Sequence, residues 1–255
     1  MSLFQHELAS GDVLVACHDG AVVGFAAVLE RGSVAYLSEL FVDPDHQSLG
    51  IGRQLLSEVL RDRHDVVCTL SSSDPRAVPL YARWGMRPCW PNFWLFAASG
   101  DISAPTASNV AVTVANDPDE IVEWDASLSG RHRPEAHAYW INHEQGVPLW
   151  LRRATTRIGY AYARMRSPLA LSNPDAATVG PVGVRQPDGA SDAVAAVVAW
   201  TAQRAPSVRF SIPGPHSALH ALLEWGMRIT ETEIFLSTDP NVLDPHRYLT
   251  SGDQL

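Results

Sequence analysis

Two glycines stand in a polar loop between an apolar run and a helical pattern. The apolar run 34–42 ends at Asp43-Pro44, and the loop after it contains Gln47-Ser48-Leu49-Gly50-Ile51-Gly52-Arg53. Gly50 and Gly52 carry no side chain where backbone N–H groups can converge, and the amino end of the next helix adds partial positive charge. This arrangement predicts a cradle for a diphosphate, to which Arg53 can add a cation. Glycines also open helices for packing reasons alone, and the loop by itself leaves that alternative open.

Two other phosphate-binding loops are excluded by the residues around these glycines. The dinucleotide-binding fingerprint requires a third glycine at a fixed offset, where this chain has Leu55. The P-loop of nucleoside triphosphatases requires Gly-Lys-Ser/Thr, and the sequence contains no lysine.

The elements that must position this loop follow from the pattern of apolar and polar residues. Two β-branched runs joined by His18-Asp19-Gly20 predict a hairpin, and the apolar spacing after the loop predicts an amphipathic helix. Pro75 and Gly85 frame a second helix. The expected order is strand 12–17, strand 21–29, strand 34–42, helix 52–61, strand 66–70, a helix that starts at 75 and ends just before 85, and strand 89–97. This β-β-β-α-β-α-β order predicts an α/β fold with a mixed sheet (α+β).

A repeat indicates that the chain contains two copies of this unit. Trp84-Gly85-Met86 recurs 141 positions later as Trp225-Gly226-Met227. The polar stretch 99–106 between the copies reads as a linker. We therefore expect a first domain over 1–100, a second over 108–240 and a C-terminal tail over 241–255.

The second copy opens with more structure than the first. Its predicted elements begin with strand 110–114, helices 117–128 and 134–142, and strands 148–153 and 157–165. Only eleven residues precede the hairpin of the first copy, which is too few for the corresponding strand and two helices.

Two motifs of the first copy, taken together, resemble the GNAT superfamily of acyl-CoA-dependent N-acetyltransferases. The first is Phe41-Val42-Asp43-Pro44 followed by the Gln-x-x-Gly-x-Gly loop. The second is Ala77-x-x-Leu80-Tyr81-x-x-x-Gly85-Met86, with methionine where phenylalanine is usual. The resemblance covers 12–98 with specific motifs and 110–238 as a degenerate copy. It implies two GNAT-like domains in tandem, the first lacking the usual N-terminal strand and helices.

The resemblance also implies a binding site for acetyl-CoA as co-substrate, without a metal. Pantetheine would bond to the strand edge at Leu40, Phe41 and Val42. The diphosphate would lie on the loop amides, which are those of Gln47, Ser48, Leu49, Gly50, Ile51, Gly52 and Arg53. Asp74 occupies the position where an asparagine commonly contacts the cofactor, and its carboxylate departs from the family pattern.

Two residues are carried over as candidate catalytic groups. Glu39 matches the carboxylate that takes the proton of the attacking amine, and Tyr81 matches the tyrosine that protonates the departing thiolate. The alternatives are that Glu39 is an outward-facing strand residue, that Tyr81 only packs, and that His46 is the base. The expected function is transfer of an acetyl group from acetyl-CoA to a primary amine of a small molecule or peptide. The alternative is a non-catalytic acyl-CoA-binding or regulatory module.

The second copy lacks these groups. Gly180-Pro181-Val182-Gly183-Val184 stands where Glu39 and its neighbours would be, and Leu222 replaces Tyr81. The loop is replaced by 185–192, which holds one glycine, one proline and two acids. Acids oppose a diphosphate, so we expect this copy to be a structural partner.

The amino-acid composition argues against several other classes of protein. With 19 basic and 28 acidic residues the net charge is −9, which argues against a general nucleic-acid binder. Three scattered cysteines predict neither a disulfide framework nor a zinc site, and the pair His216 and His220 lacks an evident third ligand. No apolar run is long enough to cross a membrane, and we expect a cytoplasmic protein. The identity of the acceptor amine and the presence of a homodimer stay open.

Overall fold

The computed structural model describes all residues except 1, 62–65, 104–108, 166–174, 253 and 255. The chain forms two compact units. The first unit contains residues 1–89, 234–242 and 254, and the second contains 90–233, 243–253 and 255. No helix in the described part of the chain is long and apolar enough to span a lipid bilayer.

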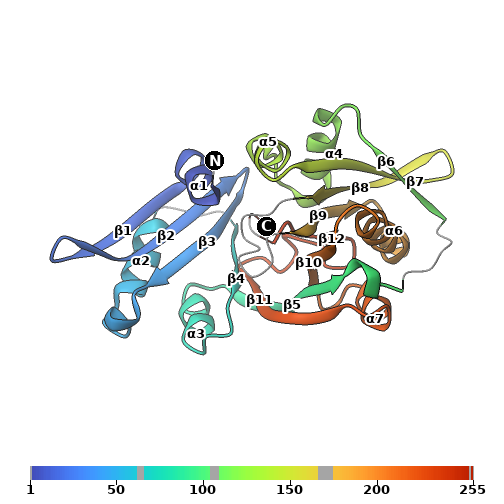
Figure 1. The fold of residues 1–255 in the computed structure, drawn as a ribbon. Helices are drawn as coiled ribbons and strands as arrows, with labels where there is room; N and C mark the ends of the chain where they lie inside the picture. Colours follow the sequence, from blue (N-terminus) through green and yellow to red (C-terminus); the bar gives the residue numbers. More distant parts are fainter. Residues whose placement is uncertain (1, 62–65, 104–108, 166–174, 253, 255) are drawn as a thin grey trace. The chain divides into compact units, whose positions relative to one another are not determined.

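The first unit is built on a mixed sheet with the strand order β1-β2-β3-β4-β11 (Figure 1). These strands are β1 (Asp12–His18), β2 (Ala21–Arg31), β3 (Val34–Val42), β4 (Val66–Ser71) and the end of β11 (Arg228–Ser237). The first three strands are antiparallel neighbours, whereas β3 and β4 are parallel because helix α2 (Ile51–Val59) connects them. The predicted β-β-β-α-β order is confirmed.

Strands β3 and β4 pair over only half of their length. Their register runs from Val34 opposite Val66 to Leu37 opposite Thr69, and the Thr69 hydroxyl donates to the Leu37 carbonyl at 2.9 Å. On the other side of β3, a bulge at Ser38 interrupts the pairing with β2. Residues 38–42 therefore continue beyond the ladder with their β4-facing edge open.

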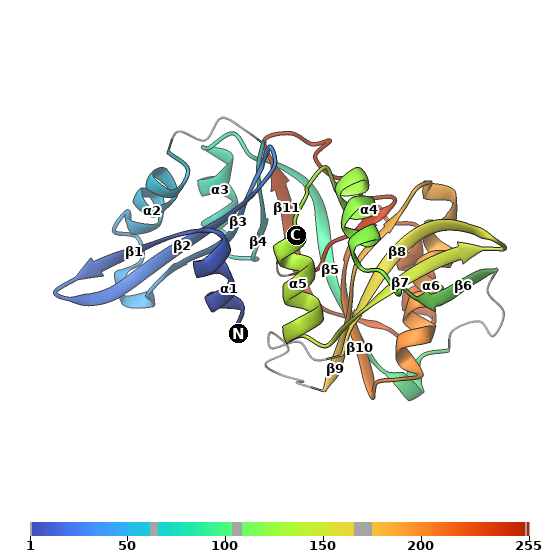
Figure 2. The same cartoon turned by 90° about the horizontal axis from the view of Figure 1, so that it is seen from above.

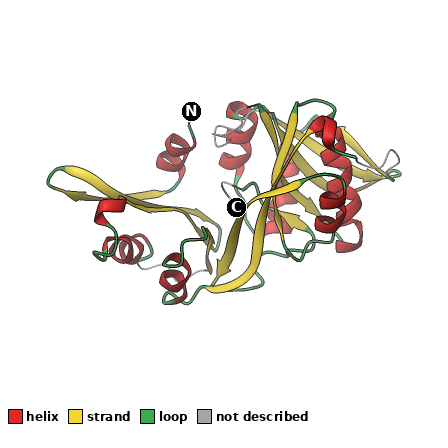
Figure 3. Ribbon diagram, turned by 60° about the horizontal axis from the view of Figure 1, so that its bottom comes forward, coloured by secondary structure: helices red, strands yellow, loops and turns green. Residues whose placement is uncertain are grey.

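Helices cover both faces of this sheet. Helices α2 and α3 (Ala77–Ala82) lie on one face, and α1 (Leu3–Ser10) lies on the other (Figures 1 and 3). The apolar face of α2 supplies Leu55, Leu56 and Val59 to the core between the helices and the sheet. Burial of such side chains contributes about 1.5–3 kcal/mol each.

Helix α1 was not expected from the sequence, which predicts no element before the hairpin. Its buried residues are Leu3, His6 and Glu7, so two of the three are polar and the usual apolar stripe is missing. A local signal was nevertheless present. Ser2 and Gln5 form a capping box, in which each side chain bonds to the backbone N–H of the other residue.

The second unit contains a longer mixed sheet with the order β5-β10-β9-β8-β7-β6. Its strands are β5 (Arg87–Ala98), β6 (Val110–Val114), β7 (Gly146–Arg153), β8 (Thr156–Arg164), β9 (Ala176–Val184), β10 (Ser207–Pro213) and β12 (Tyr248–Leu249). Its helices are α4 (Asp119–Ser129), α5 (Pro134–His143), α6 (Ala190–Ala202) and α7 (Ala218–Glu224). Figure 2 shows α4 and α5 on one side of the sheet and α6 on the other.

The strand registers show that the two sequence copies share one topology. In the first unit β2 pairs with β3 through Gly24 and Val42, and in the second β8 pairs with β9 through Gly159 and Val184. A bulge interrupts both pairs. The parallel pairing of β9 with β10 also stops early, at Thr178.

The sheet of each unit contains a strand that belongs, by sequence, to the other copy. Strand β5 belongs to the first copy by sequence, but its residues 92–98 pair with β10 of the second unit. Strand β11 belongs to the second copy, but its residues 234–237 pair with β4 of the first unit.

Candidate active site

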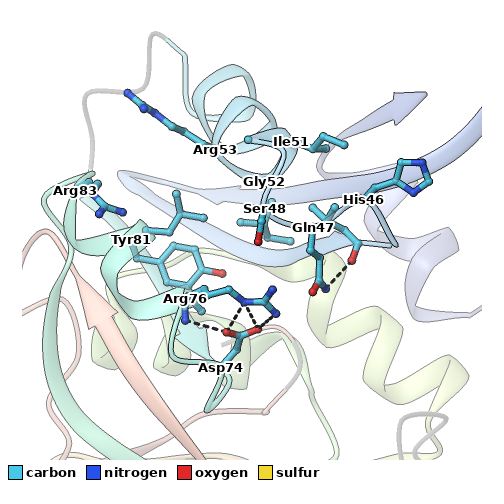
Figure 4. A pocket seen from close by; sticks show the side chains of 15 residues that line it. His46, Gln47, Ser48, Ile51, Gly52, Arg53, Asp74, Arg76, Tyr81 and Arg83 are labelled. Carbon is cyan, nitrogen blue, oxygen red and sulfur yellow. Dashed lines mark hydrogen bonds and ion pairs between the residues drawn. The ribbon is translucent and has the colours of Figure 1, made fainter. Parts of the chain in front are cut away.

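A pocket of about 270 Å³ opens in the first unit between the loop before α2 and the loop before α3 (Figure 4). It brings together residues that are distant in the sequence, from β3, both loops and both helices. Its lining residues are Leu40, Val42, His46, Gln47, Ser48, Gly50, Ile51, Gly52, Arg53, Asp74, Arg76, Ala77, Leu80, Tyr81 and Arg83. Most of the predicted binding residues are in this set.

The loop before α2 presents unused backbone donors to the pocket. Ser48 and Gly50 adopt positive φ angles of 66° and 87°, which turns the chain into the helix. In the described part of the chain, the amides from Ser48 to Arg53 have no hydrogen-bond partner. The amide of Gln47 differs, because it donates to the Pro44 carbonyl at 3.4 Å. The Gln47 side chain donates to the Val42 carbonyl at 3.1 Å and fixes the loop to the end of β3.

Three arginines, which are Arg53, Arg76 and Arg83, are among the residues that line the pocket. Asp74 is paired with Arg76, with Nη2 of the arginine 2.6 Å from Oδ2 of the aspartate. The Arg76 hydrogen bonds lower the pKa of Asp74 to about 2, so the carboxylate is ionised and its charge is balanced. The pocket is thus cationic although the whole chain carries a net charge of −9.

Arg76 and Arg83 are not among the site residues predicted from the sequence. Both stand close to the Ala77-x-x-Leu80-Tyr81 motif, so a search for cations next to the motif would have found them. Asp74 does line the pocket, but its negative charge is balanced by the paired guanidinium group of Arg76.

Alternation along β3 divides its predicted residues between two faces. Leu40 and Val42 line the pocket and pack against the core under α2 and α3. Phe41 is outside the pocket lining and 57% exposed, and it stacks on Phe25 of β2. Leu49 is also outside the lining, with 71% of its surface exposed. Glu39 shares the face of Phe41.

Tyr81 lies on α3 with its ring extending into the pocket (Figure 4). The residue is only 7% exposed. Burial raises the pKa of its hydroxyl to about 12, and the charges of Asp74 and Glu39 add to the effect. The phenol is therefore protonated at neutral pH and can donate a proton into the pocket.

Glu39 is half-buried, and the carboxylate of Glu7 on α1 is near enough to affect its pKa. Burial, with a smaller effect from the carboxylate of Glu7 on α1, raises the pKa of Glu39 to about 8. The Glu39 carboxyl group is therefore mainly protonated at pH 7 and ionises as the pH rises through 8, and only the ionised form can take a proton as a general base.

We predict that replacing Glu39 by glutamine stabilises the protein increasingly as the pH rises. The pKa of Glu39 is raised on folding. The stability of wild type that depends on a protonated Glu39 is therefore fully present below pH 4.5 and is lost as the pH rises through 8. The free energy of unfolding of Glu39→Gln relative to wild type should grow by about 3 kcal/mol between pH 5 and pH 9.

Urea denaturation at several pH values measures this difference. Glu58→Gln, at an exposed carboxylate of α2, is the matched control. Parallel stability curves for Glu39→Gln and wild type from pH 5 to pH 9 would show that Glu39 is not titrating in a desolvated site.

The other candidate groups have different surroundings. His46 lines the rim of the pocket and lies 3.5 Å from Oδ1 of Asp43. Burial raises the pKa of the Cys89 thiol, which disfavours the reactive thiolate. Among the residues that the structure describes, no cluster of three or more His, Cys, Asp and Glu side chains is placed to hold a metal ion.

The equivalent cleft of the second unit is filled by the chain itself. By register, Val182 and Gly183 of β9 correspond to Leu40 and Phe41 of β3. Strand β12 pairs with these two residues through Leu249 and Tyr248. The strand edge that is open in the first unit is therefore already occupied in the second.

A comparison with known families agrees with this geometry. The family described as "Acetyltransferase (GNAT) domain" matches residues 2–94, which include the pocket, both motifs and Glu39. The match covers little more than a third of the chain, so residues 2–94 are the part that resembles this family in sequence.

A curated relative matches the same region. An aminoglycoside N(6')-acetyltransferase type 1 from Stenotrophomonas maltophilia is 35% identical over 91 residues, which are 32% of this chain and 60% of that protein. The match thus spans less than two thirds of the relative's length.

Solved structures extend the similarity to the whole chain at the level of the fold. A proposed acetyltransferase from Pyrococcus horikoshii superposes with a TM-score of 0.73 at 15% identity, over 98% of this chain and 83% of that one. A tandem GNAT protein from the clavulanic acid biosynthesis pathway gives 0.60 at 15% identity, over 92% and 86%. The chain therefore has a tandem GNAT fold.

Proposed function

We propose that the first unit binds acetyl-CoA and transfers its acetyl group to a primary amine. The observation that carries this proposal is the run of unpartnered amides from Ser48 to Arg53 on a pocket that three arginines help to line. Amides at a helix N-terminus and guanidinium groups both favour a diphosphate.

The remaining geometry suits the rest of the cofactor. An added Cβ at Gly52 would lie 3.6 Å from the Val42 side chain, so the glycine keeps the floor of the pocket clear. The open edge of β3 beyond Leu37 offers backbone groups to the amides of pantetheine, which would bind like an added strand. The acyl end would then lie where β3 and β4 separate, with Tyr81 on one side of the sheet and Glu39 on the other.

The chemistry follows from the two titrating groups. Acetyl-CoA supplies an activated acyl group as a thioester. The neutral amine nitrogen forms a bond to the carbonyl carbon, and its proton passes to the Glu39 carboxylate directly or through water. The bond between carbon and sulfur breaks, and the Tyr81 hydroxyl gives its proton to the leaving thiolate. The products are an acetamide and a free thiol.

Tyr81→Phe tests this assignment. We expect kcat to fall about a hundredfold with little change in the KM for acetyl-CoA, because the proton is needed only as the thiolate departs. The measurement is thiol release over a panel of primary amines, together with calorimetric titration of acetyl-CoA into both proteins. An unchanged kcat would remove Tyr81 from the acid role.

The same experiment separates an enzyme from a binding module. Turnover with any primary amine supports the transferase. Micromolar binding of acetyl-CoA without turnover would favour the non-catalytic module, and no binding at all would contradict both.

A further inference from the structure

We propose that the acceptor is an arylalkyl primary amine whose apolar end rests on three phenylalanine rings beside Glu39. This inference rests on the proposed function and names its substrate class. The three residues, which we call the phenylalanine platform, are Phe4, Phe25 and Phe41.

The platform is a continuous aromatic surface built from three elements of the first unit. Phe41 of β3 stacks on Phe25 of β2 with ring centroids 5.5 Å apart and an angle of 27° between the planes. Phe4 of α1 meets Phe25 edge-on at 5.9 Å. Phe4 and Phe41 nevertheless remain 51% and 57% exposed. Two aromatic rings on one face that each keep about half of their surface in water can offer an apolar contact to a ligand.

The strand register places this surface next to the proposed base. Phe25 pairs with Phe41, and Ala27 pairs with Glu39. Residues two apart on a strand share a face, so Glu39 and Phe41 are neighbours on the side of the sheet away from the pocket. The residue opposite Glu39 is the small Ala27. An amine held at Glu39 would therefore have its substituent over the Phe41 ring.

The chemistry of this face fits a cation with an apolar tail. In its ionised form, which predominates above pH 8, Glu39 attracts the ammonium form of an approaching amine. Aromatic faces attract the same charge and also bury a hydrocarbon or aryl group. A polyhydroxylated amine of the aminoglycoside kind would gain little from three phenyl rings, because its hydroxyl groups would lose water without finding donors or acceptors there.

The size of the surface favours a small molecule over a protein partner. With half of about 200 Å² exposed on each of two rings, the platform offers far less than the roughly 800 Å² per partner of a stable protein interface. The exposed area of the platform is about what one arylalkyl group can cover.

The experiment compares two primary amines that differ in their tails, 2-phenylethylamine and ethanolamine, at saturating acetyl-CoA. For wild type we expect kcat/KM for 2-phenylethylamine to exceed that for ethanolamine at least about tenfold. Phe41→Ala should remove most of this preference by raising the KM for 2-phenylethylamine. Phe4→Ala, on α1 and away from the strand edge assigned to pantetheine, should lower the preference as well, while the values for ethanolamine and the affinity for acetyl-CoA change less than about twofold. Phe41→Leu, which keeps an apolar side chain, should retain part of the preference. Ile229→Ala, at a 43% exposed apolar residue of β11, is the matched control.

A binding measurement separates this inference from the proposed function. 2-Phenylethylamine is titrated into wild type and Phe41→Ala in the presence of CoA. Binding that Phe41→Ala weakens supports the platform even if no amine is acetylated, in which case the proposed function fails alone. Equal kcat/KM values for the two amines, or a preference that Phe41→Ala leaves intact, would overturn the platform while acetyl transfer stands.

Discussion

Replacing Gly50 by aspartate should weaken acetyl-CoA binding at least about a hundredfold, which corresponds to about 2.7 kcal/mol. Gly50 is the N-cap of α2 and has a φ of 87°, in the region that glycine adopts most readily. Its amide belongs to the unpartnered run that we assign to the diphosphate. An aspartate there places a negative charge against the phosphates. Calorimetric titration of acetyl-CoA measures the loss.

Two controls separate charge from conformational strain. Gly50→Ala introduces a similar backbone strain without the charge and should lose much less affinity. Gly130→Asp adds the same side chain at a φ of 70° in the second unit, where a Cβ would also meet open space. It should leave acetyl-CoA binding unchanged. Full affinity in Gly50→Asp would mean that the diphosphate binds elsewhere.

Replacing Asp125 by alanine should destabilise the second unit by about 3–5 kcal/mol. Asp125 on α4 is fully buried and accepts hydrogen bonds from four side chains of other elements. They are Arg133 Nε at 2.7 Å, His137 Nε2 at 3.0 Å, Tyr160 Oη at 2.5 Å and Tyr248 Oη at 2.8 Å. Burial alone would favour the neutral acid, but Arg133 and the hydrogen bonds hold the pKa of Asp125 well below its usual range. Alanine would leave the buried Arg133 charge without its counterion.

The expected loss is read from the midpoint of urea denaturation followed by tryptophan fluorescence. Asp192→Ala is the matched control, because its carboxylate pairs with Arg153 at 3.2 Å on the surface. Exposed pairs of this kind contribute about 0–1 kcal/mol. If Asp125→Ala unfolds no more easily than Asp192→Ala, the buried network does not stabilise the unit.

The loop and the tyrosine motif could be predicted because each is local in the sequence. Gly50, Gly52 and Tyr81 stand at fixed offsets from the strand and helices that position them, and the structure gathers all three around one pocket. The strand order around the loop was predictable for the same reason, since β-branched runs and turn residues are read over a few positions.

Other features depend on contacts between distant residues and could not be read in this way. Helix α1 buries His6 and Glu7, so its pattern lacks the apolar stripe on which helix prediction depends. Strand β12 has only two residues, and its place is decided by pairing with β9 and by the Tyr248 hydrogen bond to Asp125. The pairing of Asp74 with Arg76 likewise balances the charge of a carboxylate that appears unpaired in the sequence.

The exchange of final strands has a consequence for how the protein is made. The segment that completes the first unit, 234–242, leaves the ribosome only after residues 90–233 of the second unit have been synthesised. Until then one edge of β4 has no neighbour, and the amino-terminal half cannot finish folding ahead of the rest. A gene fragment ending near residue 100 would encode the entire proposed catalytic apparatus and still lack a piece of its own sheet. Each sequence copy thus depends on the other for a strand of its own sheet.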